Sequence, residues 1–492
     1  MFIPALVGKG RDGYKSIERQ AVTGFDGSPL AEATITPPLL VHEFARKRST
    51  SLRSLPIREV LDVFQRAADI FATGRPDGLE PEAYVRNASL SSGLPLSIVR
   101  KQTLGLFPPA FRMMDRFLRV QSPCGLEVFD RYFYDAGGIR VGLTPRGRNV
   151  GFVMPGNHPS THLMWVCALA MKVPVVLRPS NDDLFTPYRL VTALLEAGLP
   201  EEAIAFVPGG HDLVDPIVQA CSLSVLFGGQ QLADRYASNR NVRIHGPGRS
   251  KVVVLADADF EQTVRLISRL VLDDAGRGCI NGSAVIVEGS AGRLAAAVAA
   301  ALEKVPVEPP LAEGAQLGAV RMAEAEAYSV LIDSRLGSGA TEHTPGRAGR
   351  VATVNGVPIM RPTVIEVDSF EHPLFGMELP FPFVVFAAAR SRQDLLRAAC
   401  NSLAVVVAGE DDTLAQDLLL EPTIDKVFGS GALSTEFDPR EPHEGFLLDF
   451  LFQKKAIRSG PVSAGLSPLG GNPQECACAV SQESPRDGHA QE

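Results

Sequence analysis

The sequence predicts an α/β fold with two parallel-sheet domains, and three observations support this class. Between residues 150 and 229, short apolar strands alternate with single helices, which is the pattern of βαβ units. A second alternating region runs from about 251 to 399. The chain has 492 residues, too many for one hydrophobic core, and its 45% hydrophobic and 21% charged residues are typical of globular proteins.

Residues 1–120 are expected to form an N-terminal helical segment that packs on the first sheet domain. Apolar residues recur at helical spacing from about Pro56 to Ala72, and a second amphipathic stretch surrounds Ala110–Val120. Residues 121–150 change to a strand pattern broken by Gly-Gly and Pro-Arg-Gly turns, which predicts a β-hairpin.

The first domain is expected to span residues 151–245. Its alternating elements are strands at 149–155, 173–180, 204–209 and 224–229, with helices at His158–Ala170, Asp183–Ala197 and Asp212–Ala220. Gly198 provides a helix stop. In such sheets, nucleotides bind at the carboxyl ends of the strands.

Later segments complete the expected organisation. Residues 246–400 form the second domain, with strands at 283–289, 363–368 and 382–388, and residues 401–430 are expected to return to the first domain. The stretch 431–465 contains FLLDFLFQKKAIRSG, which reads as an exposed apolar strand that needs a partner subunit. Residues 466–492, rich in small and polar side chains, are expected to be a disordered tail.

Composition excludes several classes of function. The formal charge of -8, without a Lys/Arg block, argues against nucleic acid as a partner. No apolar run reaches membrane-spanning length, and MFIPALVGKGRDGYK lacks the features of a secretory signal. Seven scattered cysteines indicate a reducing cytoplasm, and no nearby His or Cys completes a metal site with Cys476 and Cys478, so no metal is expected.

Cys279 is the first candidate for chemistry. It follows Gly276 and Gly278 and precedes Gly282, on a turn just before an apolar strand. Glycines remove steric cover from a neighbouring thiol and let the backbone approach a substrate. The alternative is that Cys279 is a small buried apolar residue, the usual fate of a free cysteine.

Asn157 is the second candidate, because PGNHP joins a strand to a helix and can aim the Asn amide at a developing oxyanion. The alternative is a simple helix cap. Three other strand ends, VPVVLRPSNDD, AFVPGG and SVLFGGQQLAD, could line a cofactor cleft or be ordinary loops. None of them is a G-x-G-x-x-G dinucleotide fingerprint.

Taken in order, these motifs resemble the aldehyde dehydrogenase superfamily over roughly residues 120–460. The series is PGNHP, VVLRPS, AGLP, VPGG, FGGQQ, GPGRS, DADF, GRGC, RPTV and EHPLFGMELPFPF. The resemblance implies two Rossmann-like domains, one for the cofactor and one catalytic, and a small β oligomerisation element. It assigns Cys279 as nucleophile and Asn157 to the oxyanion hole. The implied cofactor-binding residues are Pro155, Gly156, Arg178, Ser180, Asn181, Gly209, Gly229, Gln230 and Glu378.

One departure from the family pattern bears on the reaction. His245 stands where typical aldehyde-oxidising members carry the Glu that activates water. A His at this position resembles the acyl-CoA reductases of bacterial bioluminescence and the similar aryl-acid reductase subunits, and coenzyme A-acylating members also lack the Glu. We expect His245 to be catalytic, assisting deprotonation of the thiol or protonating the leaving thiolate. The alternative is that His245 only packs beside the cleft and another group acts as base.

Other departures concern the cofactor. Many NAD-preferring members have a Glu at the position of Asn181, so its absence, with Arg178 nearby, favours NADP(H) over NAD(H). Arg178 could equally replace the ribose-binding Lys of the family. After Glu378 the usual Phe-Gly-Pro reads Pro-Phe-Pro, so Phe381 or Phe383 could stack on the cofactor or simply pack in the core.

The function implied is reduction of an acyl-coenzyme A to an aldehyde through an acyl-Cys279 thioester, or the reverse reaction. An aldehyde dehydrogenase that forms the free acid is the alternative, and a non-enzymatic subunit of a larger assembly is a further one. The expected partners are coenzyme A as co-substrate, a second copy in a homodimer or homotetramer, and an acyl-activating protein.

Overall fold

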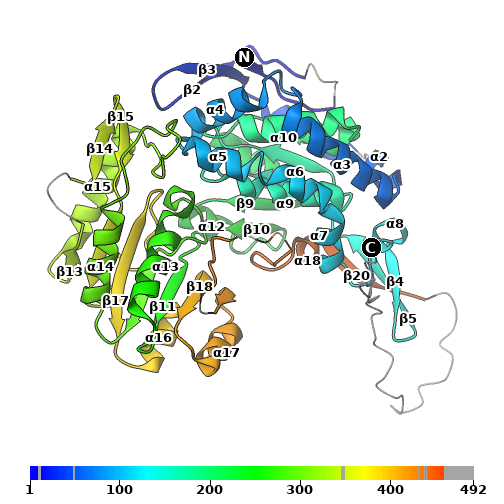
Figure 1. Cartoon of the computed structure of the whole chain (residues 1–492). Helices are drawn as coiled ribbons and strands as arrows, with labels where there is room; N and C mark the ends of the chain where they lie inside the picture. The colour runs from blue at the N-terminus through cyan, green and yellow to red at the C-terminus, as the bar shows by residue number, and fades with distance from the viewer. Residues whose placement is uncertain are drawn as a thin grey trace, which may run out of the picture.

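The computed structural model describes residues 1–458 except 9–12, 48–49, 345–348, 430, 437 and 439. Two α/β domains lie side by side, with a small sheet projecting from the first (Figure 1). The predicted α/β class with two parallel-sheet domains is confirmed. The predicted tail at 466–492, with Cys476 and Cys478, lies outside the described residues.

The first domain is built on a five-stranded parallel sheet in the order β10-β9-β6-β7-β8. The chain runs outward from β6 through β7 to β8, then crosses back to β9 and β10, so the topological switch point lies between β6 and β9. Ligands of such sheets bind at this point. The strands are β6 (Val150–Val153), β7 (Val175–Arg178), β8 (Ile204–Phe206), β9 (Leu223–Phe227) and β10 (Val242–His245).

Helices that connect these strands begin and end close to the predicted positions. Gly198, with a φ of +103°, follows the third turn of α10 and stops it as the sequence predicts. The connecting helices are η1 (Pro159–His162), α9 (Leu163–Ala170), α10 (Phe185–Glu196), η2 (Glu201–Ala203), η3 (His211–Leu213), α11 (Val214–Ala220) and α12 (Gln230–Tyr236).

The N-terminal region covers the first domain with helices, but it also contains a three-stranded sheet that the sequence analysis did not predict. This sheet consists of β1 (Phe2–Ile3), β2 (Arg19–Thr23) and β3 (Pro29–Thr34). The helices are α1 (Pro38–Arg46), α2 (Ser51–Ser54), α3 (Ile57–Thr73), α4 (Pro81–Ser92), α5 (Leu96–Gln102), α6 (Phe107–Arg112), α7 (Met114–Gln121) and α8 (Val128–Arg131). The buried face of α3 packs against α6 and α10.

The second domain contains a seven-stranded sheet in the order β13-β16-β17-β12-β11-β18-β19, parallel except for β13. Its strands are β11 (Lys251–Val254), β12 (Ala284–Glu288), β13 (Ala340–Glu342), β16 (Thr363–Val367), β17 (Phe383–Ala389), β18 (Ser402–Ala408) and β19 (Ile424–Phe428). A separate hairpin pairs β14 (Val351–Val354) with β15 (Val357–Met360). The helices are α13 (Phe260–Leu272), η4 (Asp273–Gly276), α14 (Gly292–Leu302), α15 (Met322–Leu336), α16 (Arg392–Ala399) and α17 (Asp412–Leu420).

The prediction that residues 401–430 return to the first domain is wrong. β18 pairs in parallel with β11, with Lys251 opposite Val405, and β19 pairs with β18. Every residue of β18 is buried, so the strand needs neighbours on both edges and cover on both faces. The unit β17–α16–β18 supplies them by keeping the chain in the second sheet.

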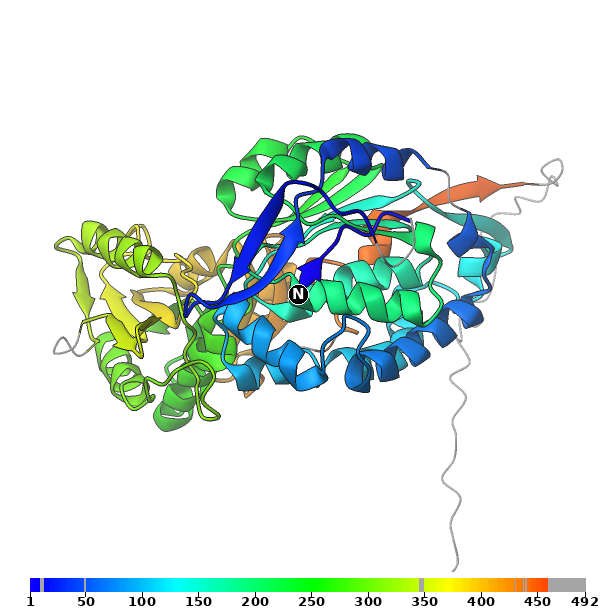
Figure 2. The same cartoon turned by 90° about the horizontal axis from the view of Figure 1, so that it is seen from above.

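The small projecting sheet is antiparallel, in the order β20-β5-β4, and extends away from both domains (Figure 2). It joins β4 (Phe133–Ala136) and β5 (Ile139–Pro145) to β20 (Phe452–Ile457). The segment predicted as one apolar strand is divided: α18 (Leu447–Leu451) is buried in the first domain, and β20 follows with its later residues exposed. Among the described residues, no helix combines the length and apolarity needed to cross a membrane.

Candidate active site

A cavity of about 940 Å³ lies between the two domains, at the carboxyl ends of β6 and β9. Several residues singled out from the sequence line it: Pro155, Asn157, Gly229, Gln230, His245, Cys279 and Glu378. The remaining candidates do not line it: Gly156, Arg178, Ser180, Asn181 and Gly209. The switch point of the first sheet thus faces the Cys279 turn of the second domain.

A strained backbone leads into the Cys279 turn. Asp274, Ala275 and Gly276 have φ angles of +52°, +56° and +71°, so three consecutive residues adopt left-handed conformations. A Cβ on Gly276 would lie 2.5 Å from the backbone nitrogen of Pro382, which leaves room for no other residue. The turn therefore holds Cys279 in one place.

The loop after β10 fixes the backbone of Cys279 from the other side. The hydroxyl of Ser250 donates to the Cys279 carbonyl at 2.8 Å. A Cβ on Gly248 would stand 2.1 Å from the same oxygen, so the two backbones are in direct contact. The segment that carries His245 is thereby packed against the backbone of Cys279.

The Asn157 side chain bridges the two domains. Its amide nitrogen donates to the carbonyl oxygen of Arg277 at 2.8 Å, two residues before Cys279. An amide nitrogen carries two N–H groups, so one remains available for an oxyanion. The helix that follows is capped by His158, whose Nδ1 accepts from the Ser160 N–H, so Asn157 is not the helix cap.

A buried ion pair that the sequence analysis missed supports the same loop. His158 Nε2 lies 3.1 Å from the carboxylate of Asp274, and Gln102 donates to that carboxylate at 2.9 Å. Burial raises the pKa of Asp274, but the charge and hydrogen bond of His158, with the bond from Gln102, hold it below its ordinary value. The pair connects the Asn157 loop to the strained turn before Cys279.

The thiol of Cys279 is half-buried, in surroundings that disfavour negative charge. Burial, followed by the carboxylates of Glu378 and Glu444, raises its pKa to about 12, and the Lys426 ammonium opposes them only in part. The group is a neutral thiol at physiological pH, so an attack on substrate requires a base to remove its proton.

His443 is the candidate for that base, and sequence reasoning did not find it. Its Nε2 lies 3.8 Å from Cys279 Sγ. Burial, with Lys426 and His245 nearby, lowers the pKa of His443 to about 3, so the ring is neutral at physiological pH. Its place as the candidate base rests on its contact with the thiol. The usable signal was a His-Glu-Gly sequence immediately before the apolar segment 446–452.

His245 lies behind His443 and does not contact the thiol directly. Its ring stacks on Phe227 with centroids 4.6 Å apart and faces the His443 ring at 6.0 Å. Its Nδ1 forms an ion pair with the carboxylate of Glu444. Burial raises the pKa of Glu444, but the hydrogen bond and charge of His245 bring it below its ordinary value. The carboxylate is therefore ionised.

Glu378 lines the same cavity and contacts the backbone of the loop after β10. Its carboxylate accepts from the backbone N–H groups of Gly248 at 3.0 Å and Arg249 at 2.6 Å, while burial raises its pKa. The Arg249 side chain crosses to the first domain and donates to Gln230 at 3.0 Å. Open space surrounds the position of a Cβ on Gly229, so a phosphate group can approach that backbone. These residues fit a dinucleotide at the switch point.

The remaining predicted cofactor residues lie at the ends of β7 and β8. Arg178 is only 4% exposed, and its guanidinium donates to the Gly209 carbonyl at 3.0 Å. Burial lowers the pKa of Arg178. A Cβ on Gly156 would stand 2.6 Å from the Ser180 hydroxyl, so this glycine lets the β6 and β7 loops approach each other.

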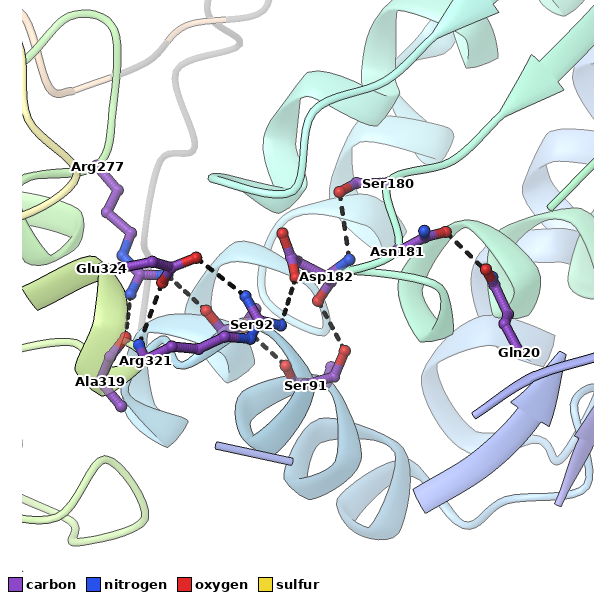
Figure 3. A network of polar contacts seen from close by, with 11 residues as sticks. Gln20, Ser91, Ser92, Ser180, Asn181, Asp182, Arg277, Ala319, Arg321 and Glu324 are labelled. Carbon is purple, nitrogen blue, oxygen red and sulfur yellow. Dashed lines mark hydrogen bonds and ion pairs between the residues drawn. The ribbon is translucent and has the colours of Figure 1, made fainter. Parts of the chain in front are cut away.

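The loop after β7 is tied to its surroundings by polar contacts (Figure 3). Asn181 accepts a hydrogen bond from Gln20 of β2 at 3.1 Å, and the Asp182 carboxylate pairs with Arg321 of the second domain at 2.8 Å. The loop has no Glu at 181, but Asp182 next to it carries an acidic charge. Arg321 neutralises that charge.

The same network reaches the catalytic turn. Arg277 donates to the carbonyl oxygens of Ser92 and Ala319, both at 2.5 Å (Figure 3). Burial lowers the pKa of Arg277 to about 10, which leaves it charged at neutral pH. The turn that carries Cys279 is thereby anchored to α4, on the first domain.

Comparison with known proteins matches the Aldehyde dehydrogenase family model to residues 44–424. The aldehyde-dehydrogenase-like protein y4uC of Sinorhizobium fredii is 26% identical over 335 residues, 64% of this chain and 63% of that protein. A malonate-semialdehyde dehydrogenase of Listeria monocytogenes is 27% identical over 264 residues, 51% of this chain and 54% of that protein. The chain thus spans less than two thirds of the length of these curated relatives.

Solved structures share the fold over nearly the whole chain. The NAD⁺ complex of an aldehyde dehydrogenase from Bacillus cereus has a TM-score of 0.77 at 16% identity, covering 93% of this chain and 96% of that one. A 3,6-anhydro-L-galactose dehydrogenase in complex with NAP has a TM-score of 0.75 at 16% identity, covering 93% and 99%. At this identity the likeness shows the fold alone.

Proposed function

The chain belongs to the aldehyde dehydrogenase family, and from that premise we propose that it interconverts an acyl-coenzyme A and an aldehyde through a thioester on Cys279. The supporting observation is the position of His245. By its resemblance in sequence, this residue stands at the position of the family's water-activating Glu. Its ring is buried beside those of Phe227 and His443. Without a free carboxylate at that place, hydrolysis of the acyl enzyme is slow and the acyl group is kept for coenzyme A or hydride.

The acylation step uses groups that the chain itself provides. His443 accepts the thiol proton, and the Cys279 thiolate attacks the acyl carbonyl carbon and expels coenzyme A as its thiolate. The free N–H of Asn157 and the backbone amide of Cys279 donate to the oxyanion, each worth roughly 2.7–4 kcal/mol. The proton held by His443 is then available to the leaving thiolate.

A nicotinamide dinucleotide, when bound, supplies the hydride for reduction or accepts it in the reverse reaction. Glu378, Gly229 and Gln230 would hold its nicotinamide ribose and pyrophosphate, and Arg178, Ser180 and Asn181 its adenosine end. We favour NADP(H), because Asn181 carries no charge and Arg321 neutralises the Asp182 carboxylate beside it.

Oxidation of an aldehyde to the free acid is a second candidate, and one observation favours it. Glu444 places an ionised carboxylate in the same cavity as Cys279, from a different part of the chain than the family Glu. Acting through His443, this carboxylate could support removal of a proton from water.

Coenzyme A dependence tests the proposal. The protein is incubated with a panel of acyl-coenzyme A thioesters without reduced cofactor, and the adduct is located by mass spectrometry. We expect acylation at Cys279, its loss in Cys279→Ala, and its retention in Cys400→Ser, which removes another cysteine lining the cavity. No adduct with any thioester, together with full-rate acid formation from aldehydes without coenzyme A, would overturn the proposal in favour of the second candidate.

The projecting sheet is the place where we expect self-association. β20 is an edge strand with exposed residues, and exposed edges pair with further strands. A homodimer or homotetramer would cover it, and light scattering of the purified protein measures the state. We also propose that an acyl-activating protein delivers the substrate.

A further inference from the structure

Lys251 is a buried lysine on the wall of the cavity. It begins β11 and is only 4% exposed. Its Nζ donates to one hydroxyl and three backbone carbonyls: Ser402 Oγ at 2.7 Å, Cys400 at 3.0 Å, Arg249 at 3.1 Å and Asn401 at 3.3 Å. An ammonium group has three N–H donors, so these acceptors engage all of them. The side chain therefore holds parts of the chain together and is not available to a substrate.

The acceptors belong to two segments that Lys251 joins. Arg249 lies in the loop after β10, and the other three acceptors lie at residues 400–402, where the chain passes from α16 into β18. Each segment contains a left-handed residue, with φ angles of +47° at Arg249 and +55° at Asn401. Such conformations are uncommon outside glycine and cost free energy, so both turns need contacts that stabilise them. The Lys251 ammonium group provides such contacts to both.

The loop at 248–250 contacts two groups of the site. Its first two N–H groups donate to the Glu378 carboxylate at 3.0 and 2.6 Å. The Ser250 hydroxyl donates to the Cys279 carbonyl at 2.8 Å. A shift of this loop would therefore move the carboxylate proposed to hold the nicotinamide ribose together with the backbone of the nucleophile. Lys251 acts on both through the loop that precedes it.

The protonation state of Lys251 depends on the groups around it. Burial, with the guanidinium group of Arg249, lowers the pKa of Lys251 to about 8, and the charges of Cys400 and Glu378 oppose this shift only in part. A neutral amine keeps two N–H donors and presents a lone pair, so it cannot satisfy the same set of oxygen atoms. Deprotonation therefore weakens the bonds that hold the two segments together.

The groups beside the reacting atoms do not titrate in this interval. The pKa of the Cys279 thiol is about 12, and that of the neighbouring His443 is about 3. A fall in rate above about pH 8 would therefore come from neither of them.

We propose that Lys251 is a positioning residue, whose ammonium group holds the loop at 248–250 so that Glu378 can bind the dinucleotide and Cys279 can attack the substrate. This role rests on the proposed function, which assigns those two residues. Lys251 exchanges no proton with the substrate. Its own deprotonation releases the loop, so catalysis should decline in alkaline solution.

A single turnover measured against pH tests this role. The full-length protein is mixed with an aldehyde and an oxidised dinucleotide, without coenzyme A, and the burst of reduced dinucleotide is followed by stopped-flow absorbance. The burst precedes release of the acyl group, so it does not depend on whether coenzyme A or water accepts that group. We expect the burst rate to fall by roughly 10- to 100-fold, the effect of a small misplacement, with a midpoint at about pH 8.

Variants separate the charge of Lys251 from its bulk. Lys251→Arg stays charged across the pH range, so its burst should lose the alkaline fall. Lys251→Met should show the low rate at neutral pH and no further fall. Ser402→Ala removes an acceptor that favours the charged form, and should shift the midpoint to lower pH. Lys304→Met, at an exposed lysine of the second domain, should match the wild type.

Stability should respond to the same proton in the opposite direction. The folded pKa of Lys251 lies below the ordinary value of 10.5, so between the two values the unfolded chain binds the proton and the folded chain does not. Over this interval the free energy of unfolding of the wild type should rise with pH relative to that of Lys251→Met, as measured by chemical denaturation. The rate would then fall on deprotonation of Lys251 although this deprotonation does not destabilise the fold.

Two outcomes would overturn the role of Lys251: an alkaline fall that is unchanged in Lys251→Met, or a wild-type burst rate of that variant at neutral pH. If neither Lys251 variant folds, an unshifted midpoint in Ser402→Ala has the same meaning. Full-rate formation of free acid without coenzyme A, after a burst that behaves as expected, would instead count against the proposed function and leave Lys251 as the positioning residue.

Discussion

Gly248 lies directly against the carbonyl group of Cys279, where a Cβ would stand 2.1 Å from the oxygen. Gly248→Ala should therefore displace the nucleophile turn. We expect a loss of roughly 1–3 kcal/mol in the free energy of unfolding, typical of overpacking, and a fall in kcat/KM of about 100-fold from misplacement of the thiol. Denaturant unfolding and steady-state kinetics measure the two effects. Gly429→Ala is the control, since nothing lies within 4 Å of that Cβ.

Asn157→Ala removes the proposed oxyanion donor and the bond to the Arg277 carbonyl. The rate of acylation should fall by roughly 100- to 1,000-fold, while stability should fall by only about 0.5–1.5 kcal/mol. Stopped-flow release of coenzyme A and thermal unfolding measure these quantities. A purely structural Asn157 would show the stability loss with near-normal acylation.

His443 and His245 should differ in effect, because only His443 is adjacent to the thiol. His443→Gln should slow acylation by about 100- to 10,000-fold, the range for general base catalysis. His245→Gln should slow acylation less, because His245 acts through the His443 ring and the Glu444 carboxylate beside it. Pre-steady-state kinetics give the comparison, and a larger loss in His245→Gln would reverse the two roles.

Asp274 should make stability depend on acid pH. Its folded pKa lies below the ordinary value of 3.8, so its contribution is present above that pH and is lost as pH falls through the folded pKa. Asp274→Asn should destabilise the protein at neutral pH by roughly 1.5–3 kcal/mol, as for a hydrogen bond to a charged group. The difference in the free energy of unfolding between this variant and the wild type should shrink below about pH 3.8. Chemical denaturation between about pH 3 and about pH 7 measures the two free energies of unfolding. A difference between them that does not change with pH would contradict the pairing with His158.

Asn181→Glu tests the cofactor proposal. A carboxylate at this position repels a 2′-phosphate, so kcat/KM with NADPH should fall by about tenfold or more relative to NADH, corresponding to roughly 1.4 kcal/mol. The ratio of the two constants is the measurement. Asn181→Gln serves as the control without charge, and an unchanged ratio in the Glu variant would mean that this loop does not discriminate the cofactors.

The sequence was informative where function depends on local order. Cys279, Asn157 and Glu378 were identified because each lies in a short motif at a strand end, and these motifs keep their order along the chain. The parallel strands that place them were predicted for the same reason, since alternating apolar segments determine βαβ units.

Long-range pairing explains what was missed. His443 meets Cys279 across 164 residues, and its loop has no helical or strand period to mark it. β18 was assigned to the wrong sheet because its apolar run is compatible with either one, and only its pairing with β11 decides. The strands β1–β3 are short, and their apolar residues do not stand out against the helices that follow.

The crossing segment between β19 and α18 has a consequence for how the enzyme is made. Both large sheets are complete at residue 428, whereas His443 and Glu444 lie beyond it, just before the chain enters the core of the first domain at α18 (Figure 1). On the ribosome, the chain therefore carries its thiol long before the partner of that thiol has been synthesised. A nascent or interrupted chain holds Cys279 without His443 beside it, so the thiol and its neighbouring imidazole come together only in the last step of assembly.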